Sequence, residues 1–230
     1  MTGFREEDKA LMGSFMHELK TPLAIVRSHL ESEITQGSLD TRLRRKLVLD
    51  VEELARLNNL INEMSLLLEC NSICDVKDFQ AHSLLELLVD VVELLEPMAG
   101  DNKQQLSLVA DENIIINMQQ EKFQQVLLNI VGNALKYTPK MGKISLLLSQ
   151  DEQVIKIGIE DDGIGMDDVT QSQIFEPFYR GDNVRVNGVG LGLAISQAIV
   201  KQHFGEIVVR SSLGKGSLFC IVLPKEKVCL

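Results

Sequence analysis

The most informative segment of the chain is LNIVGNALKYT, residues 128–138. All of it except Thr138 lies within Glu121–Tyr137, where the spacing of the apolar residues predicts a helix. Asn129, Asn133 and Lys136 are four and three residues apart and therefore share one face of that helix. Two asparagines on a buried face cost free energy unless another group binds them. Amide oxygens beside a cation suit Mg²⁺ and a polyphosphate, although a solvated polar stripe explains this pattern equally well.

Three glycine clusters follow this helix in the sequence. They are Asp161-Asp162-Gly163-Ile164-Gly165, Gly188-Val189-Gly190-Leu191-Gly192 and Gly214-Lys215-Gly216. Glycine lets backbone N–H groups approach phosphate oxygens, and the middle cluster opens a predicted helix whose N-terminal amides favour an anion. A dinucleotide fingerprint fails because Leu193 and Ile195 stand where it needs glycine, and neither Gly-Lys pair precedes the Ser or Thr of a P-loop. Plain turns are the alternative for each cluster taken alone.

The chain divides into two segments with different patterns, 1–72 and 76–226. In the first, apolar residues alternate at spacings of three and four, which is typical of a coiled coil or helical bundle. They are Met12, Met16, Leu19, Leu23, Val26 and Leu30, then Leu43, Leu47, Val51, Leu54, Leu57, Ile61, Met64 and Leu68. A break at 36–40 predicts a helical hairpin. Because two helices leave this apolar seam wet, we expect a homodimeric four-helix bundle.

The second segment interleaves predicted helices and strands. A capping-box pattern, Ser83-Leu84-Leu85-Glu86, opens a helix that we expect to end near Pro97. The other expected helices are 121–137 and 192–203, and the expected strands are 106–109, 114–117, 144–148, 154–160, 206–211 and 217–223. The predicted fold class is therefore α plus α/β: the hairpin, followed by an α/β sandwich with a mixed sheet and helices on one face.

The composition is that of an acidic globular chain. Lys and Arg number 23 and Asp and Glu 33, a formal net charge of −10. Such a surface repels nucleic-acid backbones and anionic lipids, so we expect no nucleic-acid binding and no direct membrane contact. No apolar run approaches the roughly 18–20 residues that cross a bilayer, and no secretory leader is visible. Four scattered cysteines without metal-binding spacing favour a reduced, cytoplasmic chain.

His17 is the other singular residue. It follows the seam residue Met16, so it lies about 100° around the helix, on the flank of the predicted bundle. Pro22 is expected to kink this helix one turn later. A zinc-protease pair is excluded because the residue four positions on is Thr21. Taken alone, a solvated flank histidine is the simpler interpretation.

Together and in this order, these motifs closely resemble the catalytic core of sensor histidine kinases of two-component signal transduction. The similar segments are 14–23 (phosphoacceptor box), 128–138 (Asn box), 161–165 (first Gly box), 174–180 (Phe box), and 188–193 with 214–219 (remaining Gly boxes). The chain departs from the family at Gln119, where Asp is usual, at Phe204, where Gly is usual, and at Val189, where a small or hydroxyl residue is common. The resemblance implies the ATP-binding fold of histidine kinases, gyrases and heat-shock chaperones.

The resemblance implies ATP and Mg²⁺ as cofactors. Asp161 would accept the adenine amino proton, and Asn129 and Asn133 would hold Mg²⁺. Lys136, Tyr137 and Arg180 would line the phosphates. Further nucleotide contacts would come from Gly163, Gly165, Gly188, Gly190, Leu191, Gly192, Leu193 and Ser217.

The resemblance also implies a reaction and a partner. His17 would attack the γ-phosphorus while Glu18 fixes the imidazole tautomer, and an Asp of a response-regulator receiver domain would take the phosphoryl group. ATP-hydrolysing relatives carry a Glu at the position of Asn129, so a kinase is favoured over an ATPase. Thr21 either orients a water for dephosphorylation of the regulator or satisfies the backbone at Pro22. The alternatives are a nucleotide-binding pseudokinase or scaffold, and an ATP-driven conformational clamp. The expected location is the cytoplasm, either as a free chain or as the cytoplasmic portion of a membrane-bound sensor.

Overall fold

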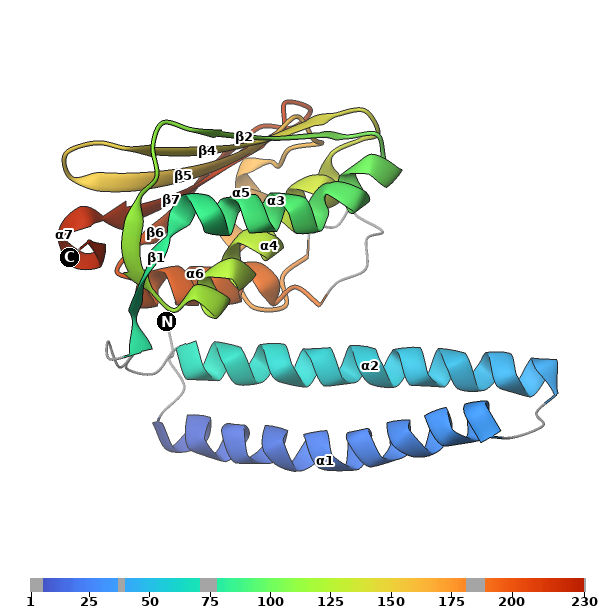
Figure 1. Cartoon of the computed structure of the whole chain (residues 1–230). Coiled ribbons are helices and arrows are strands. Elements are labelled where there is room, and N and C mark those ends of the chain that lie inside the picture. Colours follow the sequence, from blue (N-terminus) through green and yellow to red (C-terminus); the bar gives the residue numbers. More distant parts are fainter. Residues whose placement is uncertain (1–5, 37–39, 71–77, 181–188, 230) are drawn as a thin grey trace. The chain divides into compact units, whose positions relative to one another are not determined.

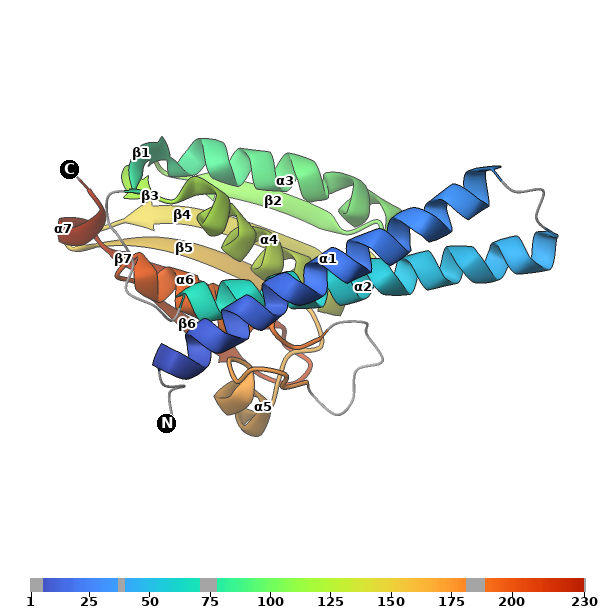
Figure 2. The same cartoon turned by 90° about the horizontal axis from the view of Figure 1, so that it is seen from below.

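The computed structural model describes residues 6–36, 40–70, 78–180 and 189–229, and only the backbone of 6–15, 17, 18 and 36. These residues form two compact units, one up to residue 72 and one from residue 73 onward. Figures 1 and 2 show a helical hairpin as the first unit and a sheet covered by helices as the second. No helix in the described ranges is both long enough and apolar enough to cross a membrane.

The first unit consists of α1 (Glu6–Gln36) and α2 (Thr41–Cys70). The two helices lie side by side in both views. The Asp40 carboxylate accepts a hydrogen bond of 3.1 Å from the Arg42 N–H and so caps the start of α2. The predicted hairpin is confirmed, and α1 continues through Pro22 as one helix.

The second unit is built on a mixed sheet. In chain order its elements are β1 (Gln80–Ser83), α3 (Leu84–Asp101), β2 (Gln105–Ala110), β3 (Ile115–Met118), α4 (Gln120–Tyr137), β4 (Lys143–Gln150), β5 (Val154–Asp161), α5 (Asp168–Gln173), α6 (Gly192–Gln202), β6 (Glu206–Ser211), β7 (Ser217–Pro224) and α7 (Lys225–Val228). The five-stranded sheet has the order β2-β4-β5-β7-β6, in which only β2 and β4 are parallel, and β1 pairs separately with β3. The predicted mixed sheet is confirmed.

The core lies between the sheet and the helices α3, α4 and α6, which cover the same face in Figure 1. Alternate residues of the central strands point into it, as the period of two requires. They are Ile144, Leu146 and Leu148 on β4 and Ile155, Ile157 and Ile159 on β5, all with no exposed surface. The apolar face of α4 packs into this core, and the N–H of Ile164, three residues after β5, donates to the Tyr137 carbonyl at the end of α4 at 3.2 Å.

The predicted end of α3 near Pro97 is wrong, because the helix continues to Asp101. Pro97 is exposed, so the carbonyl that loses its partner can bond to water, and the burial of Ala99 holds the last turn against the core. The predicted start is confirmed: the Ser83 hydroxyl accepts the Glu86 N–H at 3.0 Å. The short elements β1, α5 and α7 were not predicted, since their few residues include no run of apolar side chains with a helix or strand period.

Gln119 marks the entry to α4. It occupies the N-cap position but its side chain makes no capping bond. Instead, its backbone N–H donates to Nε2 of the fully buried His203 at 3.1 Å, while the Nδ1–H of His203 bonds to the Ile199 carbonyl at 2.8 Å. Burial lowers the pKa of His203 from 6.5 to about 4, the charge of Lys122 adds to this, and the bond to Ile199 opposes it. A neutral histidine thus anchors the helix that carries the asparagines.

Candidate functional site

Asp161 ends β5, the middle strand of the sheet, with 6% of its surface exposed. Its Oδ1 accepts a hydrogen bond of 2.9 Å from the Gly163 N–H. Burial raises the pKa of Asp161; bonds from the backbone of Gly163 and Ser217 oppose this rise, and the charges of Asp162 and Glu160 add to it. A buried carboxylate with a raised pKa favours a ligand that donates a hydrogen bond to it.

Glycines surround this carboxylate because neighbouring chain segments leave no room for side chains. A Cβ on Gly163 would lie 2.6 Å from Asp161 Oδ1. A Cβ on Gly165 would overlap the Ser212 carbonyl, and one on Gly216 would overlap the Asp161 carbonyl. Gly165 and Gly216 also have φ values of +65° and +82°, which L-residues rarely adopt. These glycines hold the loops after β5 and before β7 together around Asp161.

The polar face of α4 presents Asn129, Asn133 and Tyr137, all half-buried, and the exposed Lys136. Asn129 Nδ2 donates to Ser196 Oγ at 2.8 Å. Partial burial lowers the pKa of Lys136, and the charge of Arg180 acts in the same direction. Burial raises the pKa of Tyr137, which Arg180 opposes. The structure thus brings Lys136, Tyr137 and Arg180 within electrostatic reach of one another, as a phosphate-binding group requires.

The described segment that begins at residue 189 leads into α6. The Gly190 carbonyl accepts the Phe178 N–H at 2.8 Å, so the segment around Phe178 is held to the start of α6. Leu191 is fully buried, Gly192 and Leu193 are half-buried, and α6 begins at Gly192 without a side-chain cap. Its first N–H groups point out of the helix, where an anion can accept from them. Gly188 lies outside the described residues.

A network around Ser211 was not predicted from the sequence. The Gln171 side chain accepts the Ser211 N–H at 3.0 Å and donates to the Ser211 carbonyl at 3.1 Å. Ser211 Oγ accepts the Met166 N–H at 2.8 Å, donates to the Gly216 carbonyl at 2.8 Å and lies 3.0 Å from Ser217 Oγ. The network joins α5, β6 and β7 behind Asp161. No local pattern in the sequence signals it, because its members are up to about 50 residues apart.

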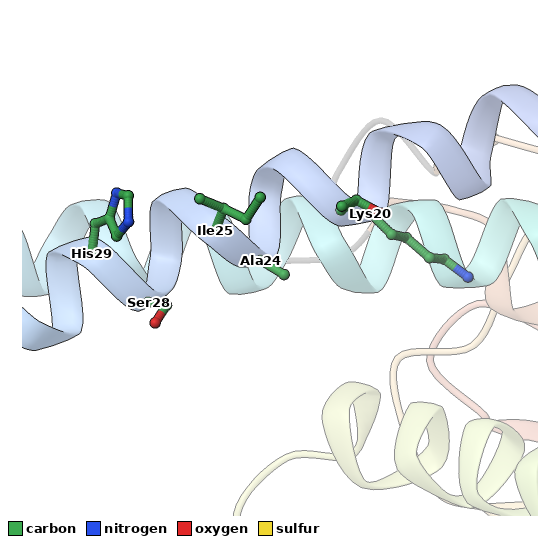
Figure 3. A pocket seen from close by; sticks show the side chains of 6 residues that line it. Lys20, Ala24, Ile25, Ser28 and His29 are labelled. Carbon is green, nitrogen blue, oxygen red and sulfur yellow. The ribbon is translucent and has the colours of Figure 1, made fainter.

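The histidine candidate lies in the other unit. His17 and Glu18 belong to α1, but their side chains lie outside the described residues. Thr21 is exposed and lines a shallow pocket along α1 with Lys20, Ala24, Ile25, Ser28 and His29. Figure 3 shows five of these side chains projecting from successive turns of the helix. Within the first unit taken alone, this surface is accessible to another molecule.

The asparagines of α4 are the candidate metal ligands. The described part of the chain contains no group of three or more His, Cys, Asp or Glu side chains that could hold an ion. The half-buried carboxamides of Asn129 and Asn133 are hard oxygen donors, which fit Mg²⁺ when phosphate oxygens and waters supply the other ligands. The donor set fits Mg²⁺ bound with a nucleotide and not a metal held by protein alone.

Comparison with known proteins finds histidine kinases that are similar to this chain. The profile of the family described as "Histidine kinase-, DNA gyrase B-, and HSP90-like ATPase" matches residues 118–227. Sensor histidine kinase WalK of Bacillus subtilis (strain 168) is 30% identical over 233 residues, which cover 96% of this chain and 37% of that protein. Sensor histidine kinase RppB of Synechocystis sp. is 31% identical over 224 residues, covering 95% and 49%. The chain thus spans less than half the length of either relative.

Solved structures extend the similarity to the fold. Full-length ShkA in complex with AMPPNP superposes with a TM-score of 0.83 at 25% identity, over 94% of this chain and 45% of that one. The nucleotide-free catalytic domain of histidine kinase ThkA superposes with a TM-score of 0.58 at 26% identity, over 64% and 97%. The first match includes both units, and the second covers a smaller share of this chain.

Proposed function

We propose that this chain, which is similar to sensor histidine kinases in sequence and in fold, is itself such a kinase and uses ATP to phosphorylate its own His17. Residues 1–72 would form the dimerisation and phosphoacceptor domain, and residues 76–226 the catalytic ATP-binding domain. The phosphoryl group would then pass to an Asp of a response-regulator receiver domain.

The main observation that supports a nucleotide site is the buried carboxylate of Asp161. An adenine amino group can donate to this acceptor, whereas guanine presents a carbonyl oxygen at the corresponding position and would be repelled. No side chain fits at glycines 163 and 216, so their backbone packs directly against Asp161. This arrangement supports ATP over GTP as the substrate.

On the phosphate side, Lys136, Tyr137 and Arg180 would bind and orient the triphosphate. The first N–H groups of α6 would add donors. Asn129 and Asn133 would hold Mg²⁺, which, when bound, neutralises charge on the phosphates during transfer. These residues act by positioning and by charge, because phosphoryl transfer needs little covalent help from the protein.

In the proposed transfer, a neutral ring nitrogen of His17 attacks the γ-phosphorus. The bond between that phosphorus and the bridging oxygen breaks, and ADP leaves with the electron pair. Glu18 would accept a hydrogen bond from the other ring nitrogen and stabilise the positive charge that develops on the imidazole. No carboxylate occupies position 129, and a carboxamide cannot act as a general base. This favours transfer to His17 over hydrolysis by water.

A regulator would dock along α1, where Thr21 is exposed beside the pocket of Figure 3. The Thr21 hydroxyl, one turn from His17, would orient a water toward the phospho-Asp of the regulator. Thr21→Ala should then slow dephosphorylation of the regulator and leave autophosphorylation and phosphotransfer intact. If autophosphorylation fell equally, Thr21 would have a structural role beside Pro22.

The proposed function is tested by incubation with γ-labelled ATP. The wild-type chain should acquire label that is lost in acid and kept in alkali, which identifies phosphohistidine. His17→Gln should abolish this label and keep ATP affinity, while His29→Gln, at an exposed histidine of the same helix, should label normally. Persistent label on the His17 variant would overturn the assignment, and a labelled wild type would exclude a pseudokinase.

A further inference from the structure

Ser196 is the polar exception on the buried face of α6. The other buried residues of this helix are Ala194, Ile195, Ala198, Ile199 and Val200. Ser196 itself has only 1% of its surface exposed. A hydroxyl buried among aliphatic side chains is costly unless it has a hydrogen-bond partner. Asn129 of α4 is that partner, since its Nδ2 donates to Ser196 Oγ at 2.8 Å.

The start of α6 contacts both ends of the Asn129 carboxamide. Gly192 and Ser196 are four residues apart and share one face of the helix. A Cβ on Gly192 would overlap Asn129 Oδ1, so the oxygen end of the carboxamide lies against Gly192 and the nitrogen end against Ser196. Glycine at 192 provides the space, and serine at 196 provides a hydrogen-bond partner.

We propose that Ser196 is a positioning residue that fixes the Asn129 carboxamide at the start of α6, with its oxygen end on the side of the metal and phosphates. The inference rests on the proposed function, since it assigns a task within the same nucleotide site. The two ends of a carboxamide are nearly equal in size but opposite in chemistry: the oxygen accepts and the nitrogen only donates. Because Nδ2 is held by Ser196, Oδ1 is directed to the start of α6, where the phosphates are expected.

Without the Ser196 hydroxyl, Asn129 would lose the bond that fixes the rotation of its carboxamide. A population with Nδ2 turned toward the metal would offer it an N–H group and no lone pair. Residues that orient metal ligands typically change metal affinity by about 10- to 100-fold when they are removed. The loss from Ser196→Ala should therefore fall on metal-dependent nucleotide binding, whereas adenine recognition at Asp161 stays intact.

The experiment measures the affinity of the full chain for AMPPNP by calorimetry, once with saturating Mg²⁺ and once with a chelator. The ratio of the two affinities is the metal-dependent gain. Ser196→Ala should lower this gain by roughly tenfold and leave the metal-free affinity within about twofold of wild type. Ser83→Ala is the matched control, because Ser83 is also buried and hydrogen-bonded but caps α3; its gain should equal that of wild type.

Each outcome supports or overturns the role of Ser196. A gain that Ser196→Ala leaves unchanged, or an equal loss of affinity with and without Mg²⁺, overturns the positioning role alone. A wild-type chain without any metal-dependent gain overturns the proposed Mg²⁺ site together with this inference. If the alanine variant unfolds, Ser196→Cys keeps the shape of the side chain with a weaker acceptor and should lower the gain in the same direction.

Discussion

The helical hairpin and the α/β unit bury their apolar side chains to different extents. In the α/β unit the inward residues of β4 and β5, such as Leu146 and Ile157, have no exposed surface. In the hairpin, seam residues remain open to solvent: Val26 is 47% exposed, Leu43 46% and Leu57 38%. The α/β unit therefore completes a core from its own elements, whereas the hairpin needs a further surface. This contrast supports a second copy of the chain as the partner of the hairpin.

The largest effect should come from a charge in the hairpin seam. Leu54→Asp places an uncompensated carboxylate from each protomer in the proposed bundle, which should weaken the dimer by at least about 5 kcal/mol. Sedimentation velocity at micromolar concentration should show a wild-type dimer and a monomeric variant. Asn59→Asp, which adds the same charge at an exposed position of α2, should stay dimeric. A monomeric wild type would contradict the inference that a second copy of the chain covers the exposed seam residues.

A cavity in the α/β core should have the next largest effect. Phe123 of α4 has no exposed surface, and its ring centroid lies 5.2 Å from that of His203. Phe123→Ala should lower the free energy of unfolding of this unit by about 3–5 kcal/mol. Both tyrosines of the chain, Tyr137 and Tyr179, lie in this unit and there is no Trp, so tyrosine fluorescence in urea reports its unfolding alone. Leu213→Ala, at a position 68% exposed, is the control and should change little.

Acid should destabilise the α/β unit through His203. Its pKa is lowered from 6.5 to about 4 in the folded state, so the unfolded chain takes up the proton first as the pH falls. Above pH 6.5 the neutral His203 makes its full contribution to the free energy of unfolding. As the pH falls from that value to pH 4, this contribution of about 3 kcal/mol is lost. Urea titrations across this range should show a shallower pH slope in His203→Gln. Equal slopes in the variant and the wild type would mean that other titrating groups dominate the pH dependence.

The smallest of these effects concerns nucleotide affinity in the α/β unit. Asp161→Asn keeps the shape of the side chain but removes the charged acceptor, which should weaken ATP binding by about 1.5–3 kcal/mol. Asp162→Asn is the neighbouring control, since Asp162 is exposed and bonds to the Lys143 N–H at 2.7 Å. Calorimetry should separate the two variants. Wild-type affinity in Asp161→Asn would place the adenine elsewhere, while dimerisation through the hairpin should be the same in both.

Local patterns were sufficient for most of the architecture. Heptad-like spacing predicted both hairpin helices, and alternation predicted β4 and β5, because helices and strands expose one face at a fixed period. The capping pattern at Ser83 predicted the start of α3, but Pro97 did not end that helix, since Pro97 is exposed to solvent while Ala99 in the last turn is buried. Ser196 carried a readable signal as a polar residue at an apolar helical position, although its partner could not be inferred.

The sequence by itself determined the longer elements, the order of the motifs and the residue types available for nucleotide chemistry. Only the tertiary structure decided which of them meet: Asp161 beside Gly216, Gln171 on Ser211, and Asn129 seated on Gly192 and Ser196. The physical reason is that helix and strand periods act over a few neighbouring residues. Contacts between residues roughly 40 to 70 positions apart depend on how the sheet and helices pack, which no local period specifies.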